Sequence, residues 1–166
     1  MIAAILILGA ALPFSNTPTF QVQMCGYSRS GIASQAQYGW SQALDAIRRV
    51  ETGGCPNEGR GARGDNGNAL GPFQIWKPYW TDSAARDATV RAGSYAQCLK
   101  DLDYSRLVVR AYMRRYCPAQ MKRLESGCGT LVDLERIARV HNGGPSGHRR
   151  KTTLAYWAKV KKEVTR

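Results

Sequence analysis

Apolar residues recur at helical spacing in four stretches of the chain. In the first, from Trp40 to Val50, they fall three or four positions apart. This period predicts an amphipathic helix with one face in a core. The same spacing predicts helices over residues 103–116, 130–140 and 151–164. We expect Pro118 to end the second of the four helices and the run Asn142-Gly143-Gly144-Pro145 to end the third.

The segment after the first helix breaks this pattern. Residues 53–71 are rich in glycine, which predicts turns, with a small β-hairpin through Asp65-Asn66-Gly67-Asn68. Gly53 and Gly54 end the first helix, so Glu51 is expected at or just past its C-terminus. Residues 78–93 are mostly polar and predict an irregular connection. The chain is therefore expected to be mainly helical, with one glycine-rich insertion.

The N-terminal region differs from the rest in composition. Residues 2–12 are apolar and uncharged, a run too short for a membrane span of about 20 residues. We interpret residues 1–15 as a secretory signal, with a buried N-terminal helix as the alternative. Residues 16–38, rich in Ser, Thr, Gly and Gln, predict a flexible tail, and residues 39–166 a single folded domain. We therefore expect a secreted protein without a transmembrane segment.

The chain is strongly basic, with 24 Lys and Arg against 12 Asp and Glu and a net charge of +12. Such a field attracts anionic partners, either nucleic acid or the bacterial envelope. Secretion favours the envelope, and no nucleic-acid motif is visible, so we expect no specific nucleic-acid binding. A basic patch for anionic wall polymers and a solvated helix face are alternative interpretations of the residues His148, Arg149, Arg150, Lys151, Lys159, Lys161, Lys162 and Arg166.

Five cysteines are typical of an oxidising compartment. None of them forms a Cys-x-x-Cys pair, so we expect no zinc site and no other cofactor. Among the possible pairings we favour disulfides between Cys55 and Cys98 and between Cys117 and Cys128, which leaves Cys25 over.

Two carboxyl groups on either side of a scissile oxygen would suit hydrolysis of a glycosidic bond. Glu51 faces the negative end of its helix dipole, which favours the protonated form that a general acid needs. Asp65, in the loop that leaves this helix, is the natural partner, with Asp82 and Glu58 as other carboxyls within reach. The alternatives are an ordinary exposed glutamate at a helix end and a turn sequence without chemistry.

The sequence lacks the motifs of several other enzyme classes. No Gly-x-Ser-x-Gly elbow and no Walker loop occur. His141 precedes a turn sequence and is by itself more typical of a turn than of a catalyst. Trp76, Tyr79 and Trp80 lie close to Gln74 and suit either stacking on sugars or core packing.

Several motifs occur together in one order. They are Val50-Glu51-Thr52-Gly53-Gly54-Cys55, the run from Gly64 to Ile75, Pro78-Tyr79-Trp80-Thr81-Asp82, the run from Ala111 to Tyr116, the run from Ala138 to Gly147, and Tyr156-Trp157. In this order, over residues 43–160, the chain resembles the invertebrate-type lysozyme (destabilase) family.

The resemblance implies a lysozyme-like α+β fold, with a cleft between a helical body and a small β-hairpin lobe. It places the proton donor at Glu51 and the second carboxylate at Asp65. The polar cleft residues would be Gln74, Tyr79, His141 and Asn142. The implied substrate is peptidoglycan, cut at the β-1,4 bond between N-acetylmuramic acid and N-acetylglucosamine, by an enzyme that we expect to be a monomer.

The chain also departs from the family pattern. It has fewer cysteines than the family usually has, and it lacks the Ser/Lys pair credited with isopeptidase activity in some members. Asn68 stands at the serine position and Trp76 at the lysine position, so we expect no isopeptidase activity. The alternative function is a non-enzymatic cationic antimicrobial or wall-binding protein on a lysozyme scaffold.

Overall fold

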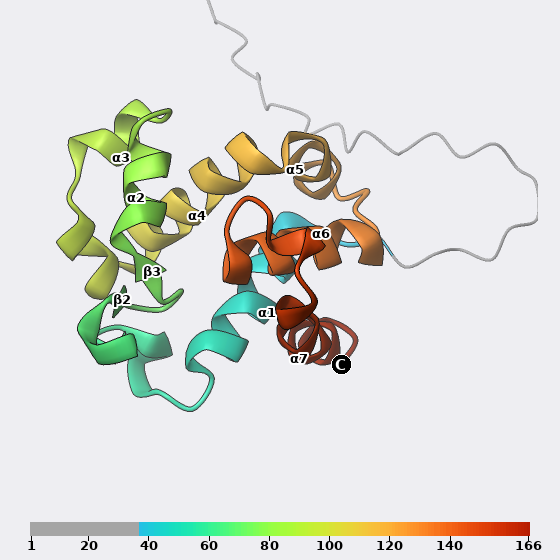
Figure 1. Cartoon of the computed structure of the whole chain (residues 1–166), viewed down its shortest axis with the longest axis horizontal. Helices are drawn as coiled ribbons and strands as arrows, with labels where there is room; N and C mark the ends of the chain where they lie inside the picture. Colours follow the sequence, from blue (N-terminus) through green and yellow to red (C-terminus); the bar gives the residue numbers. More distant parts are fainter. Residues whose placement is uncertain (1–36) are drawn as a thin grey trace, which may run out of the picture.

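The computed structural model describes residues 37–166. The predicted signal and all but the last two residues of the predicted tail lie outside the described residues. Helices dominate the described part, together with three short strands and five short 3₁₀ segments (Figure 1). The strands are β1 (Arg63–Gly64), β2 (Ala69–Leu70) and β3 (Ile75–Trp76), and the α-helices are α1 (Trp40–Thr52), α2 (Lys77–Ala84), α3 (Ala88–Ala92), α4 (Leu102–Tyr116), α5 (Pro118–Glu125), α6 (Leu131–Gly143) and α7 (Leu154–Val164).

Helix α6 is the centre of the helical body. It packs against α1, α4, α5 and α7, and α7 also packs along α1. The core-facing residues of α6 are fully buried, as the helical period requires: Leu134, Ile137, Ala138 and Val140. The amphipathic pattern thus predicted four of the helices, α1, α4, α6 and α7, with ends that differ by a few residues.

The glycine-rich insertion forms the small lobe. Its strands pair antiparallel in the order β1-β2-β3, with Gly64 opposite Ala69 and Leu70 opposite Ile75. The predicted hairpin is therefore confirmed, and its turn is the 3₁₀ segment Asp65–Gly67. Gly71 has φ +69°, and a Cβ there would lie 1.8 Å from the carbonyl oxygen of Cys98. Only glycine allows the lobe to approach the segment Tyr95–Leu99 this closely.

Three helices were not predicted. The polar stretch 78–93 forms most of α2 and all of α3. Helix α2 buries small residues, Ser83 and Ala84, and the Ser83 hydroxyl donates to the carbonyl of Val108 in α4 at 3.1 Å. Pro118 does follow the end of α4, but it also occupies the first turn of α5, where its missing N–H costs nothing. Helix α6 continues to Gly143 and ends at Gly144, which has φ +74°.

Neither of the two predicted disulfides is formed. Cys55, Cys98 and Cys117 are free thiols, so neither Cys55–Cys98 nor Cys117–Cys128 exists in the structure. Cys55 is exposed, whereas Cys98 is buried in the core, and burial raises the pKa of the Cys98 thiol to about 12. The two cysteines of the first predicted pair thus differ in burial, and a disulfide requires their Cα atoms to lie close together. The spacing of cysteines in the sequence carries no information about burial.

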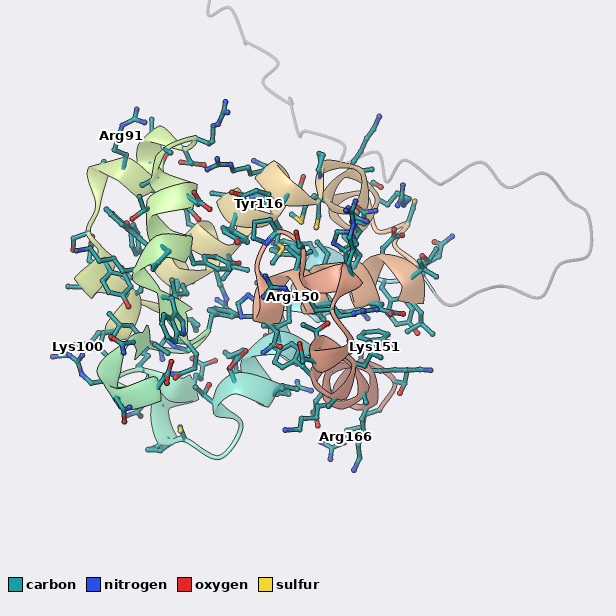
Figure 2. The ribbon with its side chains drawn as sticks, in the orientation of Figure 1. Arg91, Lys100, Tyr116, Arg150, Lys151 and Arg166 are labelled. Atoms are coloured by element: carbon teal, nitrogen blue, oxygen red, sulfur yellow. The ribbon has the colours of Figure 1, made fainter. Side chains whose placement is uncertain are left out.

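The surface carries basic side chains in several places. Figure 2 shows Arg91, Lys100 and Arg166 at separate edges of the molecule, so the positive charge is not confined to the C-terminal stretch. Within residues 37–166, no helix has the length and apolar character to cross a membrane.

Candidate active site

Glu51 lies in the last turn of α1, next to the lobe. The following residue, Thr52, is buried, and its hydroxyl donates to the carbonyl oxygen of Pro72 at 3.2 Å. This contact fixes the end of the helix against the segment between β2 and β3 of the lobe. The Glu51 side chain is 18% exposed, so most of its surface is shielded from water while one edge stays accessible.

A tyrosine hydroxyl holds the Glu51 carboxyl group. Tyr156 of α7 donates a hydrogen bond to Oε1 of Glu51 at 2.7 Å. Burial and the adjacent Glu51 carboxylate raise the pKa of Tyr156 well above its usual value. The phenol therefore keeps its proton at all working pH values and acts only as a donor to Glu51.

His141 of α6 also lies close to this oxygen. Its side chain is 4% exposed, and its Nε2 lies 3.5 Å from Oε1 of Glu51 and 3.2 Å from the carbonyl oxygen of Phe73. A carbonyl oxygen only accepts, so Nε2 must carry a hydrogen. In the neutral ring, Nδ1 is then an acceptor, and the Tyr79 hydroxyl lies 3.2 Å from it.

Tyr79 in turn orients this imidazole. Its ring stacks on Tyr112 with centroids 3.5 Å apart and meets His141 edge-on. Burial raises the pKa of Tyr79 well above its usual value, with smaller contributions from Tyr112, Cys117 and Glu51. The hydroxyl therefore stays protonated and can donate to Nδ1. The contacts with Tyr79 and Phe73 therefore direct the Nε2–H of His141 to the Phe73 carbonyl, and Nε2 lies 3.5 Å from Oε1 of Glu51.

Asp65 is placed by the tight turn of the lobe. It is exposed and has φ +48°, and Asn66 and Gln74 nearby also have positive φ, at +53° and +47°. Non-glycine residues rarely adopt this region, and such strain clusters at functional sites. The Gln74 amide donates to the carbonyl of Gly71 at 2.8 Å and passes so close to Gly64 that a Cβ there would clash with it.

These residues line one cleft with a volume of about 290 Å³. Its walls come from α1, the lobe, α2 and α6, and the lining comprises Glu51, Asp65, Ala69, Gln74, Trp76, Tyr79, His141 and Asn142. The structure thus brings together all six residues that the sequence singled out as catalytic or substrate-binding. No cluster of three or more His, Cys, Asp or Glu residues that could hold a metal ion occurs among residues 37–166.

Several other candidates lie elsewhere. Asp82 is engaged by Arg115 and by the Tyr116 hydroxyl, and Glu58 pairs with Arg60 on the surface. Trp80 is half-buried and donates to the Tyr104 hydroxyl at 2.8 Å, which is core packing rather than a sugar platform. Trp76, at 45% exposure, lines the cleft.

Sequence reasoning missed the role of Tyr156. The Tyr156-Trp157 pair carried part of the family resemblance, yet nothing in the sequence indicated that its hydroxyl reaches Glu51, 105 residues earlier. The helical period places Tyr156 on α7 but does not show which partner α7 packs against.

Comparisons with known proteins agree with this geometry. The model of the destabilase family matches residues 41–163. Lysozyme 1 of Crassostrea virginica is 35% identical over 136 residues, covering 81% of this chain and 62% of that protein. The lysozyme of Ostrea edulis is 34% identical over 133 residues, covering 80% of this chain and 75% of that protein.

A solved structure supports the same assignment. The crystal structure of Tapes japonica lysozyme is 33% identical and superposes with a TM-score of 0.53, covering 73% of this chain and 87% of that one. The family match spans most of the described residues and contains every residue of the cleft. The chain has the α+β fold of a lysozyme and belongs to the destabilase family.

Proposed function

We propose that this protein is a lysozyme that hydrolyses the β-1,4 bond between N-acetylmuramic acid and N-acetylglucosamine in peptidoglycan. The observation that carries the proposal is the environment of Glu51. Its carboxyl group lies at a cleft, mostly shielded from water, accepts a hydrogen bond from Tyr156 and lies 3.5 Å from Nε2 of His141. A second carboxylate, Asp65, lines the same cleft. Most glycosidases use two carboxyl groups in one cleft as their catalytic residues.

In this proposal Glu51 is the general acid. The Tyr156 hydroxyl occupies Oε1, so the proton that Glu51 delivers to the glycosidic oxygen is carried on Oε2. When that proton leaves, negative charge develops on the carboxyl group. The Tyr156 O–H already points at it and stabilises this charge without reorganising, and Nε2 of His141 lies 3.5 Å away.

Asp65 faces the sugar from the lobe in this mechanism. It either stabilises the positive charge that develops at the anomeric carbon or attacks that carbon. Attack gives retention of configuration and requires carboxyl groups about 5 Å apart, whereas inversion leaves room for a water at about 6.5–9.5 Å. The anomeric configuration of the first product, measured by NMR during cleavage, distinguishes the two routes.

The test is clearing of a suspension of Gram-positive cell walls by purified protein at low salt. Glu51→Gln removes the transferable proton and keeps the shape and the hydrogen bond from Tyr156, so we expect lysis to be lost. Glu58→Gln is the matched control, because Glu58 lies on the surface and pairs only with Arg60. Equal clearing by wild type and Glu51→Gln would reject the enzyme and favour a cationic wall-binding protein.

We further propose that the protein acts outside the cell as an antimicrobial. The apolar, uncharged run at residues 2–12 supports secretion, and the net charge of +12 supports attraction to anionic wall polymers. N-terminal sequencing of the protein from culture medium would test this, because a secreted form should start beyond residue 12.

A further inference from the structure

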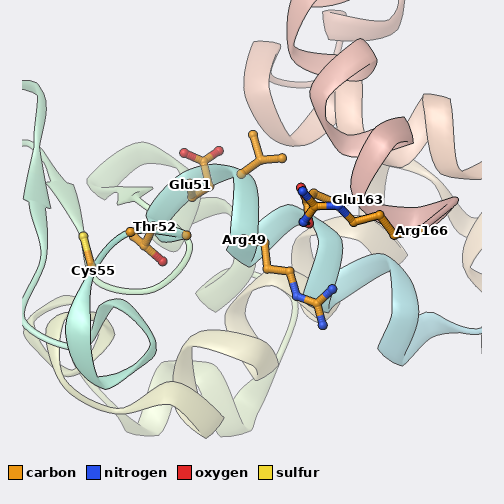
Figure 3. A pocket seen from close by; sticks show the side chains of 9 residues that line it. Arg49, Glu51, Thr52, Cys55, Glu163 and Arg166 are labelled. Carbon is orange, nitrogen blue, oxygen red and sulfur yellow. The ribbon is translucent and has the colours of Figure 1, made fainter.

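A second cavity opens beside the cleft, at the end of α1. Its volume is about 440 Å³, and it is broad and open to solvent. Residues 49–55 form one wall, and Glu163 and Arg166 at the end of the chain form the other. Glu51 lines both this cavity and the cleft, so a ligand that spans the two would pass the proposed acid. Figure 3 shows Glu51 on one side and Arg49, Glu163 and Arg166 gathered on the other.

Charged groups line the far end of this cavity. Arg49 is exposed, and its side chain makes no ion pair or hydrogen bond to any residue between 37 and 166. Arg166 pairs with Glu163 at 3.2 Å. The cavity thus presents a guanidinium without a partner among the described residues, next to a carboxylate–guanidinium pair, and nothing in the proposed glycosidic chemistry uses any of the three groups.

We propose that this cavity binds the peptide stem attached to the muramic acid residue next to the bond that is cut. This inference rests on the proposed function. Each muramic acid carries its peptide through a lactyl ether, so the stem leaves the glycan within a few atoms of the sugar ring. Arg49 and Arg166 would bind the carboxylates of the stem, for which a guanidinium fork is well suited.

The mixed charge favours a peptide over a polyphosphate. A stem has carboxylates and, at a diamino residue, a free ammonium group. Glu163 can accept that ammonium, whereas it would repel a chain of phosphates. Because Glu51 lines both the cavity and the cleft, a stem attached to the cut glycan can reach the cavity while the scissile bond lies in the cleft.

The test compares glycan strands that carry stems with the same strands after an amidase has removed the stems. For wild type, kcat/KM should be higher on the strands with stems. In Arg49→Gln and Arg166→Gln we expect the ratio of the two kcat/KM values to fall about fivefold each, through KM. Arg60→Gln, a surface arginine outside the cavity, should keep the wild-type ratio.

A second variant tests the ammonium contact. Glu163→Gln should lower kcat/KM on stems with a free side-chain amine more than on the same stems after N-acetylation. Equal effects on both would overturn the assignment of Glu163.

An unchanged ratio in both arginine variants, in a wild type that cleaves both strands, would overturn the stem site and leave the lysozyme proposal intact. Losses seen only on walls that carry teichoic acid would also overturn it, in favour of a polyphosphate site. If wild type cleaves neither strand, the proposed function itself fails.

Discussion

The hydrogen bond from Tyr156 to Glu51 gives the sharpest prediction about rate. Tyr156→Phe removes one oxygen and keeps the ring that packs in α7. The lost bond, 2.7 Å long, goes to a group that becomes charged during the reaction, and such bonds contribute about 1.5–3 kcal/mol. Because the charge is only partly developed at the transition state, we use the lower end and expect kcat to fall about tenfold. KM should change little, since the bond contacts no sugar.

The matched control for this variant is Tyr116→Phe. Tyr116 donates an equally short bond, 2.7 Å, to the carboxylate of Asp82 outside the cleft. We expect this variant to keep the wild-type kcat. Steady-state kinetics on soluble stem-bearing glycan would measure both. A wild-type kcat in Tyr156→Phe, or an equal fall in both variants, would refute the reasoning that this hydroxyl acts through Glu51.

Further predictions concern the second carboxylate and the stability of the fold. Asp65→Asn should lower kcat about 100-fold with a small change in KM, measured on the same glycan. Gly71→Ala should destabilise the protein by about 3 kcal/mol in urea unfolding, because its Cβ would collide with the Cys98 carbonyl at a positive φ. Asp133→Asn should cost about 2 kcal/mol at pH 7, because Asp133 is buried, caps α6 through Thr130 and pairs with Arg123. Burial opposes the ionisation of Asp133, but the bonds from Arg123 and Thr130 outweigh it and lower its pKa; the stabilisation is therefore complete above the unfolded value of about 3.9 and is lost as the pH falls through the lowered pKa. No release of product from a γ-glutamyl-lysine isopeptide substrate is expected, and measurable hydrolysis would contradict this.

The sequence predicted the helices whose burial has a clear period. In α1 the apolar residues from Trp40 to Val50 lie on the one side of the helix that faces the core. Their spacing in the sequence therefore has the period of a helix, which made the helix predictable. Helix α2 escaped prediction because it packs against α4 through Ser83 and Ala84, which do not stand out as apolar residues. Helix α5 was not predicted because Pro118 was interpreted only as the end of α4. A proline is equally well suited to the first turn of a helix, and Pro118 lies there in α5.

The sequence predicted which residues form the site, but it did not predict the hydrogen bonds and contacts between them. Glu51 and Asp65 followed from the two-carboxylate requirement together with the family resemblance, and the glycine-rich turn between them indicated a lobe. The contacts that orient Glu51 depend on how α6 and α7 pack against α1. Local pattern carries no information on that packing, so the hydrogen bond from Tyr156 and the tautomer of His141 could only come from the structure.

The most direct test of the proposed hydrolysis is mass spectrometry of the soluble products from purified peptidoglycan. Wild type should release fragments that end in reducing N-acetylmuramic acid, each heavier by one water than a fragment made by transglycosylation. Glu51→Gln should release none, while Glu58→Gln should give the wild-type products. Anhydro-muramic ends from wild type, or equal release by Glu51→Gln, would contradict hydrolysis with Glu51 as the acid.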